Sequence, residues 1–146
     1  MSWQTVAEAL KDQLEAVTAM NGRVSIEDLK VLAGGTAKAA IIDYGGFTQQ
    51  RRSMGGDHVV TWLALVNLYV RYQDDAQVRD DLRDFRDAVL TRINRYPELN
   101  ATAGVFDAFV VGGESMPEQV LVGSVKFFGE TLRCEVADEI AVTYQE

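Results

Sequence analysis

The chain has 146 residues, a length typical of one domain, and we expect a single domain over residues 1–146. Acidic residues outnumber basic ones by 22 to 14, and the net charge of -8 disfavours a nucleic-acid-binding protein, which needs a basic face. One His and one Cys nearly exclude zinc sites, disulfide frameworks and His-dependent triads. The start of the chain lacks signal-peptide features and no apolar run is long enough to span a membrane, which predicts synthesis in the cytoplasm and no membrane contact.

The first predicted element is an amphipathic helix that begins after Ser2, a residue type that favours the N-cap. Its apolar residues recur at three- and four-residue steps and form one stripe: Trp3, Val6, Leu10, Leu14 and Val17. Asn21-Gly22 is expected to end this helix. For residues 23–37, a short helix and an irregular surface segment both remain open.

Two strands are predicted next, over residues 39–44 and 58–72. The glycine pairs Gly45-Gly46 and Gly55-Gly56 predict a polar loop over residues 47–54 between them. Along 58–72 both alternating sets of side chains begin apolar and one set then turns polar. This pattern is typical of a central strand whose end reaches solvent.

A long helix is predicted from Asp74-Asp75 to about Arg95, where Tyr96-Pro97 ends it. Its expected buried stripe is made of five residues: Val78, Leu82, Phe85, Val89 and Ile93. The acids on this helix lack the spacing of a calcium loop and alternate with five arginines. We therefore expect an exposed, ion-paired face, with pairs such as Asp75–Arg79 and Arg83–Asp87.

The last third of the chain is predicted to be β, with strands over 105–111, 119–128 and 131–143. Gly112-Gly113 is expected to open a loop, Gly129-Glu130 to form a tight turn, and residues 137–139 to form a bulge. The pattern predicts an α+β fold with the order α-β-β-α-β-β(-β). Its two main helices would pack on one face of a mostly antiparallel sheet.

Candidate catalytic residues are few. His58 is the only histidine, and no nucleophile and orienting acid can be assigned to it, so we expect a structural or solvent role. Cys134 alternates with Leu132 and Val136, which predicts a core or half-buried thiol. We expect no enzyme activity, no catalytic residue, no cofactor and no metal. Two interpretations from other functional classes remain. One is a small hydrolase with carboxylates that converge in a pocket, and the other is an unrelated oligomeric binding module.

The predicted loop over residues 47–54 carries Gln49, Gln50, Arg51 and Arg52, a basic pair at its tip in an acidic protein. One interpretation is an ordinary hairpin loop. The other is an arm that contacts a neighbouring subunit, a tube of other subunits or a phosphate backbone, because guanidinium groups pair well with both carboxylates and phosphates.

The order of predicted elements resembles that of the tail terminator (tail completion) proteins of long-tailed bacteriophages. The resemblance is carried by residues 62–71 (WLALVNLYVR), which run into the helix of residues 74–95 and then Tyr96-Pro97-Glu98-Leu99. The strand over 105–111 and the closing strands over 119–143 also fit that family, so the resemblance covers most of the chain. It rests on element order, because the family has no catalytic signature to match.

The resemblance implies a structural virion protein that forms a homo-oligomeric ring, usually a hexamer, by repeating one head-to-tail interface. Such a ring caps the tail tube, ends tail polymerisation and provides the interface for the head connector or stopper protein. DNA would pass through it without specific binding, and the acidic charge would limit sticking. The alternative is a head-to-tail joining (neck) protein of the same particle.

Overall fold

The structure is a computed structural model of the chain, and its description covers most residues. The described residues are 2–17, 23–28, 32, 37–51, 57–72, 74–95, 105–115, 120–122 and 125–141. Within these described residues, two helices and six strands follow one another. They are α1 (Trp3–Glu15), β1 (Val24–Ile26), β2 (Lys38–Arg51), β3 (Asp57–Arg71), α2 (Asp75–Arg95), β4 (Val105–Ser115), β5 (Val120–Val122) and β6 (Val125–Ala141).

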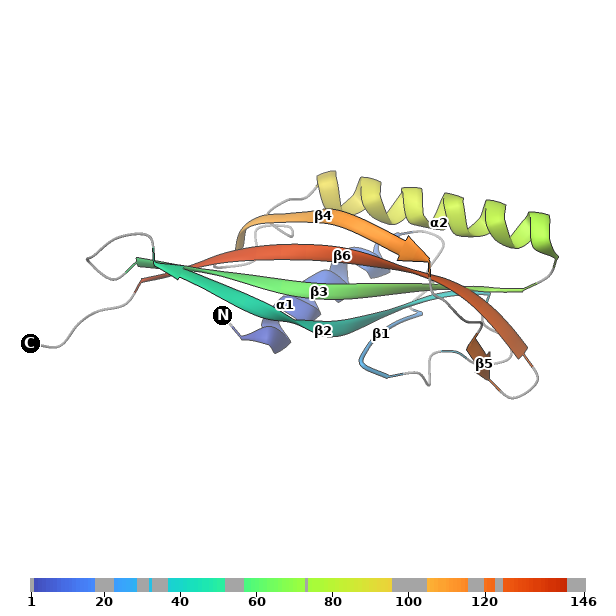
Figure 1. Cartoon of the computed structure of the whole chain (residues 1–146), viewed down its shortest axis with the longest axis horizontal. Coiled ribbons are helices and arrows are strands. Elements are labelled where there is room, and N and C mark those ends of the chain that lie inside the picture. Colours follow the sequence, from blue (N-terminus) through green and yellow to red (C-terminus); the bar gives the residue numbers. More distant parts are fainter. Residues whose placement is uncertain are drawn as a thin grey trace, which may run out of the picture.

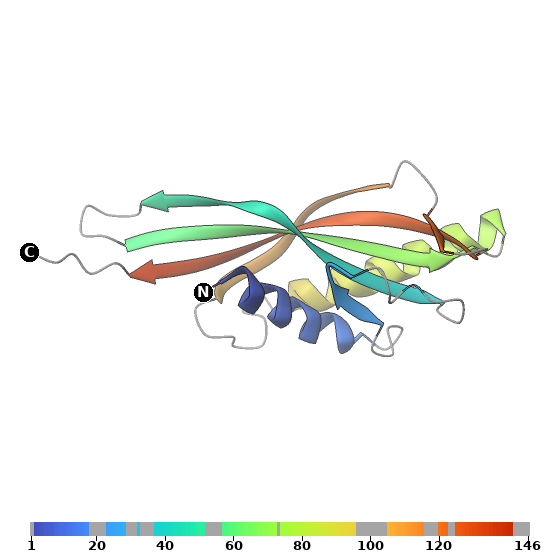
Figure 2. The same cartoon turned by 90° about the horizontal axis from the view of Figure 1, so that it is seen from below.

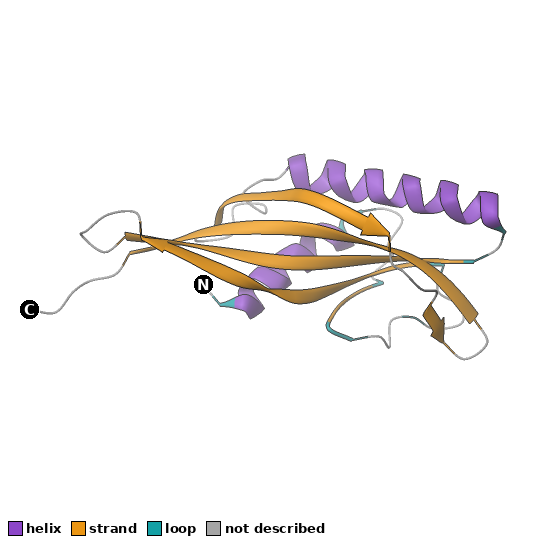
Figure 3. Cartoon of the chain, in the orientation of Figure 1, coloured by secondary structure: helices purple, strands orange, loops and turns teal. Residues whose placement is uncertain are grey.

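The strands form one twisted sheet in the order β1-β2-β3-β6-β4, with β5 paired to β6 (Figures 1 and 3). The pairs are antiparallel except for β1, which runs parallel to β2. Both helices lie on the same side of the sheet (Figure 2). The predicted α+β class is therefore confirmed, and β3 is a central strand as its pattern indicated.

Helix α1 begins where its sequence predicted. The Ser2 side chain accepts a hydrogen bond from the backbone N–H of Thr5 at 3.3 Å, so Ser2 is the N-cap. Val6, Leu10 and Leu14 are fully buried, which confirms the apolar stripe. Asn21-Gly22 lies outside the described residues.

Helix α2 also matches its predicted span. A carboxylate oxygen of Asp74 accepts a hydrogen bond from the N–H of Gln77 at 2.8 Å and so caps the first turn. The predicted stripe is confirmed: four of its residues are buried, and Leu82 packs against them half-buried. Neither described helix is long and apolar enough to cross a membrane.

The main core lies between the helices and one face of the sheet. Its buried sheet residues come from β1, β2, β3, β4 and β6: Val24, Ala40, Ile42, Ala64, Val66, Leu68, Val70, Ala108, Leu132, Cys134 and Val136. A smaller apolar cluster forms on the opposite face, where Tyr69 and Phe127 pack with Leu32. The rest of that opposite face is more open, with Leu63 and Leu65 only half-buried.

The glycine pairs Gly45-Gly46 and Gly112-Gly113 do not break their strands, contrary to the sequence prediction, and Gly55-Gly56 lies outside the described residues. Gly45-Gly46 lies inside β2 as a bulge, since Tyr44 pairs with Ala64 while Phe47 pairs with Trp62. Gly46 has a φ of 105°, which favours glycine. Gly112-Gly113 likewise lies inside β4, directly after the register shift between Val110 and Gly112. A bulge and a strand-ending loop both demand glycine, so the sequence pattern alone does not separate them.

The predicted tight turn at Gly129-Glu130 is also wrong. Gly129 pairs with Tyr69 and Glu130 pairs with Leu68, so β6 runs straight through this position. The hairpin instead joins β5 to β6, with Val122 opposite Val125. Long-range pairing with β3 decides the path of β6 here, because the local Gly-Glu signal is weak beside a continuous ladder.

Two smaller predictions change as well. The bulge expected in β6 at residues 137–139 lies in β4, where the register shifts between Val105 and Asp107, while β6 stays in continuous register with β3. Within 23–37, residues 24–26 form strand β1 instead of a helix, because they pair with Ala40–Ile42.

Candidate functional site

Three strands extend beyond the helices as a projecting arm (Figure 2). We define the arm as residues 47–51 of β2, 57–61 of β3 and 137–141 of β6. Thr61 at its base pairs with Thr48 on one side and Ala137 on the other, and near the tip His58 pairs with Arg51 and Ile140. The arm is therefore continuous sheet, which holds it in a fixed direction relative to the domain.

Three of the four predicted contact residues, Gln49, Gln50 and Arg51, lie in this arm, in a strand and not in a loop. Gln49 and Gln50 are exposed residues of β2 and pair with Val60 and Val59. Consecutive strand residues point to opposite faces, so the two glutamines do not form one patch. Arg51 is the last residue of β2, its side chain is not described, and Arg52 lies outside the described residues. The predicted loop over 47–54 is thus wrong for residues 47–51.

An aromatic row at the base of the arm is the feature that sequence reasoning missed. The ring centroids lie 5.1 Å apart for Trp3–Tyr44, 6.4 Å for Tyr44–Trp62 and 5.4 Å for Phe47–Trp62. The glycine bulge keeps Tyr44 and Phe47 on one face although they are three residues apart. Phe47 is 54% exposed and Tyr44 is 44% exposed, so the row presents apolar surface to solvent.

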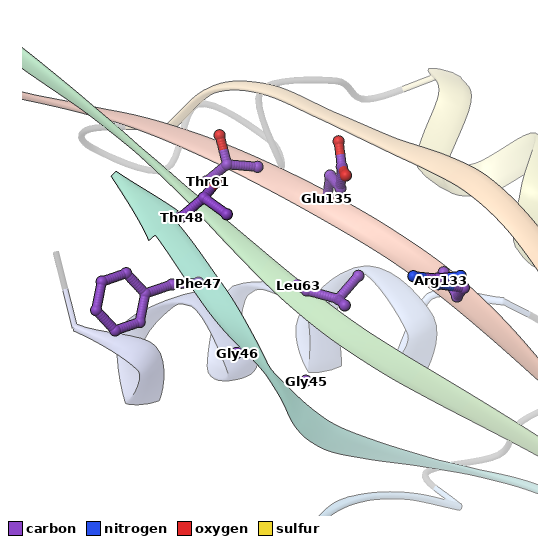
Figure 4. Close-up of a pocket in the computed structure, with 8 residues that line it drawn as sticks. All are labelled: Gly45, Gly46, Phe47, Thr48, Thr61, Leu63, Arg133 and Glu135. Carbon is purple, nitrogen blue, oxygen red and sulfur yellow. The ribbon is translucent and has the colours of Figure 1, made fainter. Parts of the chain in front are cut away.

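The other face of the sheet has a shallow depression of about 330 Å³ next to the bulge (Figure 4). Thr48 of β2, Thr61 and Leu63 of β3, and Arg133 and Glu135 of β6 contribute to its lining. Figure 4 shows these side chains spread along three neighbouring strands. The depression offers hydroxyl groups and one charge of each sign, which suits contact with a polar surface.

A polar network crosses this same face at the middle of the sheet. Nδ2 of Asn67 donates to Oδ2 of Asp43 at 2.6 Å, and Oγ1 of Thr131 donates to Oδ1 of Asn67 at 2.7 Å. Burial raises the pKa of the Asp43 carboxyl, nearby Glu27 raises it further, and the hydrogen bond from Asn67 opposes both. Burial, and then the charge of Asp43, raise the pKa of Tyr69. The network ties β2, β3 and β6 together.

Helix α2 has the expected ion-paired surface, although the contacts differ in part from those predicted. Nε of Arg79 donates to the backbone carbonyl oxygen of Asp75 at 3.0 Å, and Arg83 pairs with Asp80 and Asp84 instead of Asp87. Arg83 lies 3.3 Å from Asp80, and Arg86 bridges Asp87 at 3.5 Å and Glu130 of β6 at 3.4 Å. Arg83 thus pairs with acids one and three residues away along the helix, and Arg86 pairs with the acid that follows it. The exposed pairs of Arg83 contribute little to stability, typically below about 1 kcal/mol each, whereas the pair of Arg86 with Glu130 is partly buried.

Of the two candidate catalytic residues, Cys134 is the one whose side chain is described. It is fully buried, as predicted, and burial raises the pKa of its thiol to about 12. A thiol held protonated in this way is a poor nucleophile. His58 lies in β3, but its side chain is outside the described set. Within the described ranges, no three His, Cys, Asp or Glu residues are grouped so that they could hold a metal ion.

The arrangement supports docking through surface elements: a projecting three-stranded arm, an exposed aromatic row at its base and outer strands on both sides of the sheet. A scan against protein-family models and a search of curated proteins found no match for this chain.

Proposed function

We propose that this protein is a structural subunit of a long-tailed bacteriophage that forms a ring on the tail tube. The ring ends tail polymerisation and provides the interface for head attachment. Its partners are further copies of itself, in a ring that is usually a hexamer, the tail tube protein and the head connector or stopper. It resides in the tail and neck of the virion, works without a cofactor or catalysis, and lets DNA pass.

The arm is the observation that carries this proposal. It is built from strands of the central sheet and extends past the helical layer (Figure 2). A subunit that has to reach a neighbour or a tube needs a projecting element whose direction is fixed. Its exposed Phe47 gives that element an apolar contact, and apolar side chains of this size are typical anchors of protein interfaces.

Two further features support the same proposal. The order of helix, strands, helix and closing strands agrees with the resemblance noted in the sequence. The net charge of -8 disfavours retention of DNA that moves through a ring. Contacts between subunits in such a ring are heterologous, so one surface of each copy meets a different surface of the next.

Particles assembled without this chain provide the direct test. We expect overlong or uncapped tail tubes in electron micrographs, because nothing stops polymerisation. Finished tails of normal length beside unattached heads would instead identify a head-to-tail joining protein of the same particle. Normal, infectious particles would refute both roles.

Reversing Arg51, the last residue of β2, together with its chain neighbour Arg52 tests the contact predicted for these two arginines. We expect Arg51→Glu with Arg52→Glu to reduce tail capping, because acids on the partner would then repel the tip. The matched control is Arg79→Glu with Arg83→Glu, which reverses two exposed arginines of α2. Normal capping by the arm variant would exclude the arm tip from the contact.

A further inference from the structure

The face of the sheet that lies opposite the helices carries apolar side chains. Strand β3 places the half-buried Leu63 and Leu65 on this face, since Ala64 between them belongs to the main core on the other side. Phe109 of β4 pairs with Glu135, which itself pairs with Leu63, so it points to the same side and is 42% exposed there. An antiparallel sheet with one face in water usually shows polar residues on that face, so these apolar residues indicate a surface that becomes covered.

Two opposite charges lie side by side in the middle of this face. Arg133 and Glu135 are two residues apart on β6 and point to the same side, because they pair with Leu65 and Leu63. In Figure 4 this side of the sheet is turned toward the viewer, with α1, in faint blue, behind the strands. Within the described part of the chain, neither side chain forms an ion pair or a hydrogen bond. We call the surface of Leu63, Leu65, Phe109, Arg133 and Glu135 the open face.

The spacing of the two charges fits a second copy of the same face. Consider a two-fold axis midway between two facing sheets, perpendicular to the strands at the level of Cys134. It places Arg133 of each copy over Glu135 of the other, so two ion pairs form, as in any contact in which both copies use the same surface. Facing sheets pack about 10 Å apart, which long side chains such as these bridge. An axis along β6 would instead place arginine over arginine, so the charges select the first arrangement.

The same axis also brings the apolar residues of the open face into contact. On β3 it places Leu63 of one copy over Leu65 of the other, and this contact again forms twice. On β4 it places Phe109 over Gly112, because Phe109 pairs with Glu135 and Gly112 pairs with Arg133. A β-carbon at Gly112 would meet nothing within 4 Å, so the ring of Phe109 from the other copy has room there. The charges and the apolar residues therefore agree on one arrangement.

The size of the open face suits a small, dissociable contact. The sheet has four long strands here, β2, β3, β6 and β4, and the face extends along β3 from Thr61 to Asn67. At a spacing of about 4.8 Å between strands and about 3.4 Å per residue, the face measures roughly 20 Å by 25 Å. Two such faces would bury on the order of 1,000 Å², the lower limit for a specific contact.

We propose that two copies of this chain form a two-fold dimer through the open face, with Arg133 of each copy opposite Glu135 of the other. The inference goes beyond the proposed ring, whose contacts join two different surfaces. A contact that joins the same surface of both copies ends at two subunits. The dimer covers the leucines and Phe109 of the open face, which are otherwise in water.

Single charge reversals test the two ion pairs. We expect Arg133→Glu alone and Glu135→Arg alone each to weaken dimer formation by roughly tenfold or more in sedimentation measurements on the purified full chain. Each reversal places like charges opposite one another twice. Arg79→Glu, at an exposed arginine of α2, is the matched control and should associate like the wild type. A wild-type chain that is monomeric at about 1 mM would overturn the dimer, and so would unchanged association of both reversed variants.

A mixture of the two reversed variants separates a two-fold dimer from other contacts. Equal amounts of Arg133→Glu and Glu135→Arg should form a heterodimer, because the acids of one chain then face the arginines of the other at both pairs. The double exchange Arg133→Glu/Glu135→Arg should associate with itself like the wild type for the same reason. If neither the mixture nor the double exchange associates, the open face does not pair with itself and the proposal is overturned.

Changes in β4 test the apolar part of the contact. We expect Phe109→Lys to weaken the dimer by roughly tenfold or more, because it removes the ring and brings a lysine close to Arg133 of the other copy. Gly112→Leu should weaken it as well, since it fills the space that receives the ring. Leu121→Lys, at a 63% exposed residue of β5, is the matched control and should associate like the wild type. Circular dichroism checks that each variant is folded, and equal association of all three would overturn the contact.

The dimer and the proposed function fail in different experiments. Association of the purified chain and its variants decides the dimer. The length of tails in particles assembled without the chain decides the capping role. Failure of either one therefore leaves the other standing.

Discussion

A β-carbon added to Gly45 would lie 2.9 Å from Cγ of Leu63 and 3.0 Å from its carbonyl oxygen. The close approach places β2 against β3 at the bulge that keeps Tyr44 and Phe47 on one face. We expect Gly45→Ala to destabilise the fold by about 1–3 kcal/mol, because a backbone atom cannot move away as a side chain can. Urea unfolding measures this difference, and a change in free energy below about 0.5 kcal/mol would contradict it.

Two other glycines calibrate that measurement. Gly46 has open space around a β-carbon but a φ of 105°, so Gly46→Ala should destabilise through backbone strain, by about 1 kcal/mol or more. Gly112 has open space and no such φ, so Gly112→Ala should be neutral or slightly stabilising. Equal effects at all three positions would show that neither the close approach nor the φ matters.

A buried amide joins the two helices. Gln13 is 3% exposed, and its Oε1 accepts a hydrogen bond from Nε of Arg92 at 3.0 Å. We expect Gln13→Ala to destabilise by about 1–3 kcal/mol, because it removes a charge-assisted bond within the packed layer. Thermal unfolding followed by circular dichroism provides the measurement.

Gln4→Ala is the matched control for this bond. Gln4 lies on the same helix and donates to Glu8 at 3.1 Å, but both residues are exposed. Its loss should change stability by less than about 0.5 kcal/mol. If Gln13→Ala is equally mild, the contact between helices contributes nothing measurable.

The Asp43 network predicts a dependence of stability on pH. Burial and Glu27 raise the pKa of Asp43 above 3.8, so the folded state holds this proton more tightly than the unfolded state. The contribution is therefore present at low pH and is lost as pH rises through the raised pKa. Relative to the wild type, Asp43→Asn should gain stability as the pH rises from about 4 towards neutral, because its amide never ionises.

Asn67→Ala should change the pH dependence of stability in the opposite direction to Asp43→Asn. It removes the hydrogen bond that stabilises the Asp43 carboxylate, so it should raise the pKa of Asp43 further and strengthen the loss of stability with pH. Denaturation midpoints across a pH series measure both effects. A difference between wild type and Asp43→Asn that does not vary with pH would exclude a raised pKa at Asp43.

The candidate site was only partly predictable from the sequence. The region around Gln49 and Arg51 was singled out because a basic pair stands out in an acidic chain. The aromatic row was not, since Trp3, Tyr44 and Trp62 come from three elements whose proximity no local pattern encodes. The spacing of Tyr44 and Phe47 around two glycines was the available signal, and it indicates a bulge only once the partner strand is known.

The sequence by itself determined the elements whose signals are local. Helices α1 and α2 and strand β3 follow from the periodicity and caps of their own residues, such as Ser2 and Asp74. Tertiary structure decided where strands continue through glycine, at Gly45-Gly46 and Gly129, because a residue's path there depends on a ladder with a distant strand. The small count of His and Cys was visible at once, but the projecting arm and the two outer strands exist only in the paired sheet.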